Sequence, residues 1–96
     1  MTSPCVYILA SGRNGTLYVG VTRNIVRRVW EHRTDAIESF TQKHRVHHLL
    51  YCEFHETMPD AILREKRIKR WRRAWKVGLI ERDNPQWRDL YGEIAA

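Results

Sequence analysis

Tyr18, Arg28 and His32 are residues near the N-terminus whose types and spacing could act together on a ligand. Tyr18 lies in a strand-forming run that ends at a glycine, and Asn24 is a suitable N-cap for a helix that follows directly. Arg28 and His32 are four residues apart, so they lie side by side along one helix edge, whereas Arg27 points to the opposite side. This edge lies where core and solvent meet. A side chain there can be held still and also contact a ligand.

Plainer interpretations of these residues are favoured by the pattern alone. Tyr18 can be a strand aromatic that packs on the core, and Arg28 and His32 can belong to a solvated helix edge. The sequence therefore proposes a site here without requiring one.

Glu65 is the sharpest single signal further along the chain. It lies at the margin of a tryptophan-rich stripe on a predicted helix, where burial of a carboxylate is costly unless the charge is paired. A bound cation would explain this placement. An ion pair with Lys69 or Arg72 on the same helix explains it as well, and the pattern alone favours that pairing.

The same helix carries a run of cations: Arg64, Lys66, Arg67, Lys69, Arg70, Arg72, Arg73 and Lys76. Eight cations against one carboxylate exceed what pairing along a helix requires, so contact with phosphates is as good an explanation as a solvated face. Four histidines resemble a cluster: His44, His47, His48 and His55. Nothing in the pattern fixes them on one face, so we do not expect a zinc site.

The elements that must position these side chains follow from local patterns. Residues 5–10 and 16–20 predict a hairpin closed by the Gly/Asn-rich turn at 11–15, which brings Tyr7 and Tyr18 onto paired strands. We expect a first helix over 24–38, with its inner stripe made by Ile25, Val29, Ala36 and Phe40, a polar connection over 39–45, and a third strand over 46–54 with both faces covered.

The second half of the chain predicts helices. Thr57 and Pro59 mark the start of a second helix, which we expect to end at about Gly78. Its predicted buried stripe is Ala61, Ile68, Trp71, Trp75 and Leu79. Asn84 and Pro85 predict the start of a short last helix with its inner face made by Trp87, Leu90, Tyr91 and Ile94.

Composition sets the frame for these elements. The 96 residues suffice for one domain, residues 1–96, with one modest core, and we assume a monomer. A net charge of +6 favours a polyanionic partner. The chain has no apolar run of membrane-spanning length and no visible secretory signal, so we expect no membrane partner and a cytoplasmic location. Cys5 and Cys52 are too few for a disulfide framework and are expected as free buried thiols.

The chain contains, in the same order, several motifs that resemble those of the GIY-YIG nuclease superfamily. Val6-Tyr7-Ile8 and Tyr18-Val19-Gly20 match its two tripeptides, Arg28 follows ten residues after the second tyrosine, and Glu65 lies on a later helix. Further stretches resemble its small single-domain bacterial members: 18–22, 40–43, 49–51, 64–71 and 84–90. The resemblance implies an α+β fold, in which helices flank a three-stranded antiparallel sheet in the order β-β-α-β-α-α.

The resemblance also implies a function, that of a metal-dependent endonuclease that hydrolyses phosphodiester bonds in nucleic acid. DNA is favoured over RNA as the nucleic-acid partner, and the substrate is left open. Glu65 would be the one protein ligand of a divalent ion, Mg²⁺ or Mn²⁺, that keeps most of its water. Tyr18 would activate or orient the attacking water, and Tyr7 would hydrogen-bond across the site. Arg28 would stabilise charge on the phosphate, and His32 would assist proton transfer. The expected nucleic-acid contacts are Lys43, Arg64, Lys66, Arg67, Lys69, Arg70 and Arg73.

Two positions depart from the pattern of the superfamily. Val21 stands where several members have a lysine, and residues 75–77 stand about where members place an asparagine. Asn84 is the nearest asparagine, and its Asn-Pro context indicates helix capping. A non-catalytic nucleic-acid-binding module on the same fold is therefore the alternative function. A protein-interaction domain whose charge is incidental is a third.

Overall fold

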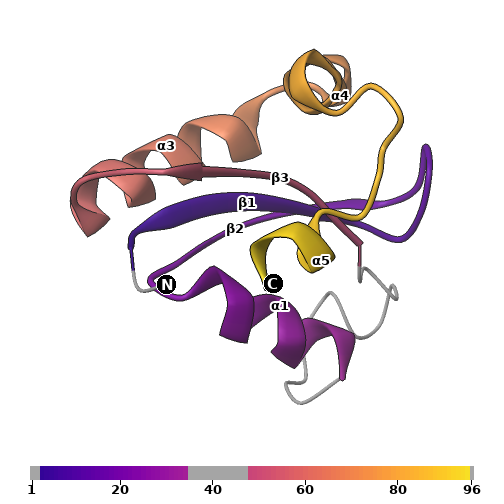
Figure 1. Ribbon diagram of the computed structural model, residues 1–96. Helices are drawn as coiled ribbons and strands as arrows, with labels where there is room; N and C mark the ends of the chain where they lie inside the picture. Colours follow the sequence, from indigo (N-terminus) through magenta and orange to yellow (C-terminus); the bar gives the residue numbers. More distant parts are fainter. Residues whose placement is uncertain (1–2, 35–47, 96) are drawn as a thin grey trace.

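The computed structural model of the chain describes residues 3–34 and 48–95. Three antiparallel strands form its central sheet: β1 (Cys5–Ala10), β2 (Leu17–Thr22) and β3 (His48–Phe54). The strand order is β2-β1-β3, so the first strand lies in the middle. Helices α1 (Ile25–Arg33) and α5 (Tyr91–Ile94) lie on one side of the sheet, and α3 (Met58–Arg70) and α4 (Arg73–Asp83) lie on the other (Figure 1). The predicted fold class is confirmed.

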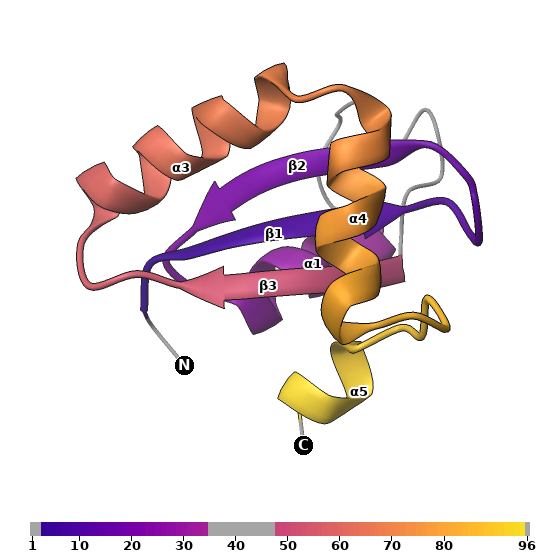
Figure 2. The same cartoon turned by 90° about the horizontal axis from the view of Figure 1, so that it is seen from above.

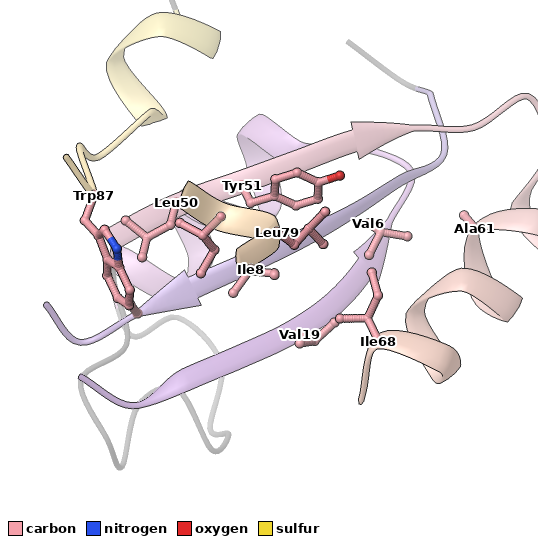
Figure 3. Packing of buried hydrophobic residues seen from close by; sticks show 11 residues of the cluster. Val6, Ile8, Val19, Leu50, Tyr51, Ala61, Ile68, Leu79 and Trp87 are labelled. Atoms are coloured by element: carbon pink, nitrogen blue, oxygen red, sulfur yellow. The ribbon is translucent and has the colours of Figure 1, made fainter. Parts of the chain in front are cut away.

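The alternation of β1 side chains builds two cores. All of its residues are buried, and successive side chains of a strand point to opposite faces. Val6 and Ile8 pack with Leu50, Ile68 and other residues under α3 and α4 (Figure 3). The intervening positions, Cys5, Tyr7 and Leu9, pack with Ile25, Val29 and Leu49 under α1. Both faces of β3 are covered, as the sequence predicts.

The predicted hairpin is confirmed, and its register sets the position of the tyrosines. Tyr7 lies opposite Gly20, and Leu9 lies opposite Tyr18. Residues 18 and 20 share one face of β2, so both tyrosines face α1. In the turn, Asn14 adopts a left-handed conformation with φ of 60°, which asparagine tolerates better than most residues.

Helix α1 begins as predicted but ends earlier. The Asn24 side chain accepts a hydrogen bond from the Arg27 backbone N–H at 3.1 Å, which is the expected N-cap. The helix ends at Arg33 and not at Glu38, because Thr34 is the C-cap and its hydroxyl bonds back to the Trp30 carbonyl at 2.9 Å. Several predicted features lie outside the described residues: Ala36 and Phe40 of the inner stripe, the connection 39–45, and Lys43, His44 and His47.

The single second helix expected up to Gly78 is wrong, because the structure divides it. The start is as predicted, with the Asp60 N–H donating to the Thr57 hydroxyl at 3.3 Å. At Trp71 the backbone becomes extended, with ψ of 147°, and α4 then crosses over the strands (Figure 2). No glycine or proline marks this break. A straight helix rises about 1.5 Å per residue and would carry residues 79–80 past the sheet, whereas the turn buries them in the core.

Two positions change role because of this break. Trp75, placed in the predicted buried stripe, is 56% exposed on α4. Gly78 lies inside α4 and does not end a helix. The break therefore gives α4 a direction of its own and brings Leu79 and Ile80 onto the sheet.

The last segment also differs from its prediction. Asn84 does not begin a helix. It is the buried C-cap of α4, and its side-chain amide donates to the carbonyls of Leu50 and Arg88 at 3.2 and 2.9 Å. These bonds hold a non-helical turn in which Trp87 is buried with φ of 55°. The last helix is only Tyr91–Ile94.

None of the helices in the described ranges combines the length and apolar character that a membrane span requires. Cys5 and Cys52 are free, Cys5 fully buried and Cys52 partly.

Candidate active site

The hydroxyl of Tyr7 lies at the centre of a cluster of three rings. It is 3.2 Å from Nε2 of His32, and the Tyr7 ring is fully buried. The Tyr18 ring is 6.2 Å from the Tyr7 ring and 5.5 Å from the His32 ring, centroid to centroid. The hairpin supplies the tyrosines and α1 supplies the histidine. The structure thus brings these three predicted site residues together.

His32 does not occupy the solvated edge that its helical position indicated. It is only 2% exposed and faces the sheet. Burial of an imidazole is acceptable here because the Tyr7 hydroxyl provides a hydrogen-bond partner.

Gly20 makes room for this arrangement. A Cβ atom at position 20 would collide with the hydroxyl and ring of Tyr7 and would come within 3.0 Å of Cε1 of Tyr18. The sequence places this glycine at the end of a strand, but β2 continues to Thr22. A glycine inside a strand is a signal of close approach by another group, and that signal could have identified Gly20 as a site residue.

The electrostatics around Tyr7 keep its hydroxyl protonated. Burial raises the pKa of Tyr7 well above its usual value, and the neighbouring Tyr18 raises it further. The Arg28 guanidinium partly opposes this shift, which also shows that Arg28 lies close to the hydroxyl. Tyr7 is therefore a neutral hydrogen-bonding group at physiological pH.

Arg28 and Arg27 share a carboxylate at the mouth of the site. Arg28 Nε lies 3.2 Å and Arg27 Nε 3.7 Å from oxygens of Glu31. The two side chains are 39% and 75% exposed, respectively. Both also line one cavity of about 500 Å³ with Val21 and Met58. The expectation that Arg27 points to the opposite side is therefore wrong, because the shared carboxylate draws both arginines together.

Glu65 lies on α3, on the side of the sheet opposite to α1 (Figure 1). It is 8% exposed on the inner face of α3, and Lys69 Nζ lies 2.8 Å from its Oε2 atom. The Lys69 ion pair, one of the alternatives that the pattern favours, is thus present. Helix α3 packs against β1 and β2, and β2 is an edge strand. Tyr18 of β2 and Lys69, the ion-pair partner of Glu65, line one cavity.

Glu65 offers a metal ion a single carboxylate, one oxygen of which is paired with Lys69. Within residues 3–34 and 48–95, histidine, cysteine and carboxylate side chains form no group of three or more that could hold a metal ion. A divalent ion here would take Glu65 as its protein ligand and fill its other positions with water. Mg²⁺ accepts such an arrangement readily.

The predicted phosphate-binding cations are in different situations. Lys66, Arg67 and Arg70 are exposed on α3. Arg64 is engaged elsewhere, because its Nε atom donates to Glu53 at 3.0 Å and its guanidinium stacks 5.2 Å from the centre of the Trp71 ring. Arg73 donates to the Gly15 carbonyl at 2.7 Å and so joins the start of α4 to the hairpin turn.

Two histidines of the predicted group can be placed. His48 begins β3, and His55 lies 2.6 Å from a Glu53 oxygen just after β3. His44 and His47 lie outside the described residues.

The site residues thus come from three elements. A hairpin carries the two tyrosines, α1 carries the arginine and the histidine, and α3 carries the glutamate. A family model described as the GIY-YIG catalytic domain matches residues 3–77. The chain belongs to the GIY-YIG family. This match covers every predicted catalytic position as well as Glu65.

Individual proteins are also similar to this chain. A UPF0213 protein of Staphylococcus aureus strain Mu3 is 36% identical over 81 residues, which are 84% of this chain and 98% of the relative. The UPF0213 protein MW0443 of strain MW2 gives the same values. The solution structure of the UPF0213 protein BH0048 from Bacillus halodurans has a TM-score of 0.56 at 22% identity, covering 91% of this chain and 92% of that one. This last similarity is one of fold.

Proposed function

We propose that this GIY-YIG protein is a metal-dependent nuclease that hydrolyses phosphodiester bonds in nucleic acid, with DNA as its preferred substrate. The observation that supports this proposal best is the Tyr7 hydroxyl, held by His32 beside Tyr18 and Arg28. Arg28 lines an open basic cavity and can bind a phosphate there, and the buried Tyr7 hydroxyl and His32 imidazole behind it form a pair through which a proton can move.

Each of these residues has a proposed role. Arg28 binds the reacting phosphate, because it is partly exposed and a guanidinium fork matches phosphate oxygens. Tyr18 orients the attacking water. Tyr7 stays protonated, and the hydrogen bond between its hydroxyl and Nε2 of His32 holds the imidazole in place. His32 thereby becomes an oriented group that can accept or deliver a proton.

Glu65 is the proposed ligand of the divalent ion. When bound, the ion supplies Lewis-acid stabilisation of charge on the phosphate. The inner face of α3 holds the carboxylate in place, and Lys69 has to release Oε2 before that oxygen can bind a cation.

The alternative is a nucleic-acid-binding module without turnover, and one observation favours it. Lys69 already neutralises Glu65, so the carboxylate has a counter-ion without any metal. Under this alternative, the exposed cations of α3 bind phosphates and the tyrosine cluster is only part of the core.

Replacement of Glu65 by glutamine tests the nuclease proposal. The full chain is incubated with labelled duplex, single-stranded and branched DNA and with RNA, in Mg²⁺, Mn²⁺ or chelator. We expect metal-dependent cleavage by the wild type and none by Glu65→Gln. Binding and the free energy of unfolding should change little, because an ion pair with an exposed lysine contributes less than about 1 kcal/mol.

The exposed Glu56 provides the matched control, since Glu56→Gln removes the same charge away from the site. It should cleave like the wild type. Binding without cleavage by the wild type supports the alternative module. Absence of binding to every substrate contradicts both functions.

A further inference from the structure

A second cavity lies along the outer edge of β2, where α3 gives way to α4. Its volume is about 300 Å³, and it is lined by Leu17, Tyr18, Val19, Lys69 and Lys76. The two lysines come from different helices, and they face one cavity because of the break at Trp71. Nothing in the roles proposed above uses Lys76.

Lys76, which lines this cavity, is partly buried. Among the residues that the structure describes, its ammonium makes no ion pair or hydrogen bond. Arg64, the other partly buried cation of α3 and α4, is bonded to Glu53. An ammonium at the wall of a cavity can bind an anion that enters the cavity. The geometry therefore leaves a place for an anion from outside.

The rest of the cavity has the character of a nucleotide site. Leu17 and Val19 provide apolar surface, and the Tyr18 side chain adds an aromatic edge. Among residues 3–34 and 48–95, β2 is an edge strand, and no described strand pairs with the backbone groups on its outer side. Apolar and aromatic surface below two ammonium groups suits a sugar or base together with its phosphate.

We propose that this cavity binds the nucleotide next to the cleaved linkage, with its phosphate held by Lys76 and Lys69. The inference rests on the proposed nuclease function, because Tyr18 belongs both to this cavity and to the candidate active site. Lys76 is then a substrate-binding residue that positions the strand and takes no part in proton transfer.

The test is a scan with uncharged linkages. DNA substrates carry a single methylphosphonate at successive positions, and the cleaved linkage is mapped with wild type in Mg²⁺. Dissociation constants are measured in chelator, so that no turnover occurs, for wild type, Lys76→Gln and Arg82→Gln. Arg82 is the control because it lies on α4, is exposed and borders a different cavity, beside Trp75.

For wild type, we expect one neutral linkage adjacent to the cleaved one to weaken binding several-fold. Lys76→Gln should weaken binding to unmodified DNA, lower the log-log salt slope, and be less sensitive to that neutral linkage than wild type, because only the Lys69 contact to the phosphate remains. Arg82→Gln should keep the wild-type scan. Its thermal unfolding and that of Lys76→Gln should match the wild type.

Two results would overturn the inference. If Lys76→Gln remains as sensitive to the neutral linkage as wild type, the cavity does not hold that phosphate, while the nuclease function stands on wild-type cleavage. If wild type neither binds nor cleaves any substrate, the inference and the proposed function fail together.

Discussion

At the scale of single residues, the candidate site depends on Gly20, which has no side chain and so leaves room for the Tyr7 ring. Gly20→Ala would add a Cβ against the Tyr7 hydroxyl and ring, and Tyr7 is too deeply buried to move freely. Such overpacking costs about 1–3 kcal/mol. We expect a lower free energy of unfolding in urea and loss of cleavage, because the Tyr7 hydroxyl can no longer reach His32.

Gly78→Ala is the control for that substitution. A Cβ at position 78 meets nothing within 4 Å, and the position lies inside α4. The free energy of unfolding of this variant should rise by about 0.5–1 kcal/mol, and its cleavage activity should equal that of the wild type. Full activity in Gly20→Ala as well would show that the placement of Tyr7 is irrelevant to catalysis.

Arg27 and Arg28 are predicted to differ in function although they share Glu31. Arg28 lies close enough to Tyr7 to lower its pKa, and Arg27 is largely in solvent. Arg28→Ala should abolish cleavage, whereas Arg27→Ala should only weaken binding to nucleic acid. Single-turnover rates and dissociation constants separate the two effects. An equal loss of rate in both variants would contradict the assignment.

At the scale of elements, Glu53 ties β3 to α3. Its carboxylate accepts hydrogen bonds from the Tyr51 hydroxyl at 2.5 Å and from Arg64 Nε at 3.0 Å, and His55 Nε2 lies at 2.6 Å. Burial raises the pKa of Glu53, but these bonds outweigh burial and hold the pKa below its usual value. The ionised form is therefore the one that stabilises the fold.

This depressed pKa predicts how stability depends on pH. The contribution of Glu53 is complete above the pKa of an unfolded glutamate and is lost as the pH falls through the lower pKa of the folded state. At pH 7, Glu53→Gln should lower the free energy of unfolding by about 1–2 kcal/mol. Urea titrations at pH 7 and at pH 3 should show this difference shrinking at the lower pH. A difference of equal size at both values would rule out the charged form as its cause.

The helix boundaries differ in how well the sequence predicts them. Asn24 and Thr57 cap their helices as predicted, because capping depends on a few neighbouring residues. The break at Trp71 has no local signal, since it results from the fit of Leu79 and Ile80 onto the sheet. Tertiary packing overrides helix propensity at that point.

The site was predictable to a similar extent. The tyrosines meet because a hairpin register follows from local turn chemistry, and the spacing of Arg28 and His32 reflects one helix. The burial of His32 and the engagement of Arg64 by Glu53 depend on partners distant in the sequence. Gly20 was identifiable as a glycine inside a strand, but neither composition nor hydrophobic periodicity reveals such a position.

At the scale of the whole molecule, the net charge of +6 predicts that the affinity for nucleic acid falls as the salt concentration rises. The exposed Lys66, Arg67 and Arg70, if each contacts one phosphate, give a log-log slope of about −3 on duplex DNA. Fluorescence anisotropy at about 50 to 200 mM salt measures this slope. Affinity that stays flat over that range would argue against phosphate contacts by these residues.

The position of β1 in the middle of the sheet has a consequence during synthesis. β1 and β2 can close their hairpin within microseconds, but an isolated hairpin is marginally stable in water. The second edge of β1 stays unpaired until β3 has left the ribosome, and every β1 side chain belongs to a core that is not yet complete. While residues 23–54 are being translated, β1 is an apolar strand with one unpaired edge. Such a strand is prone to aggregate with neighbouring chains and is a binding site for chaperones.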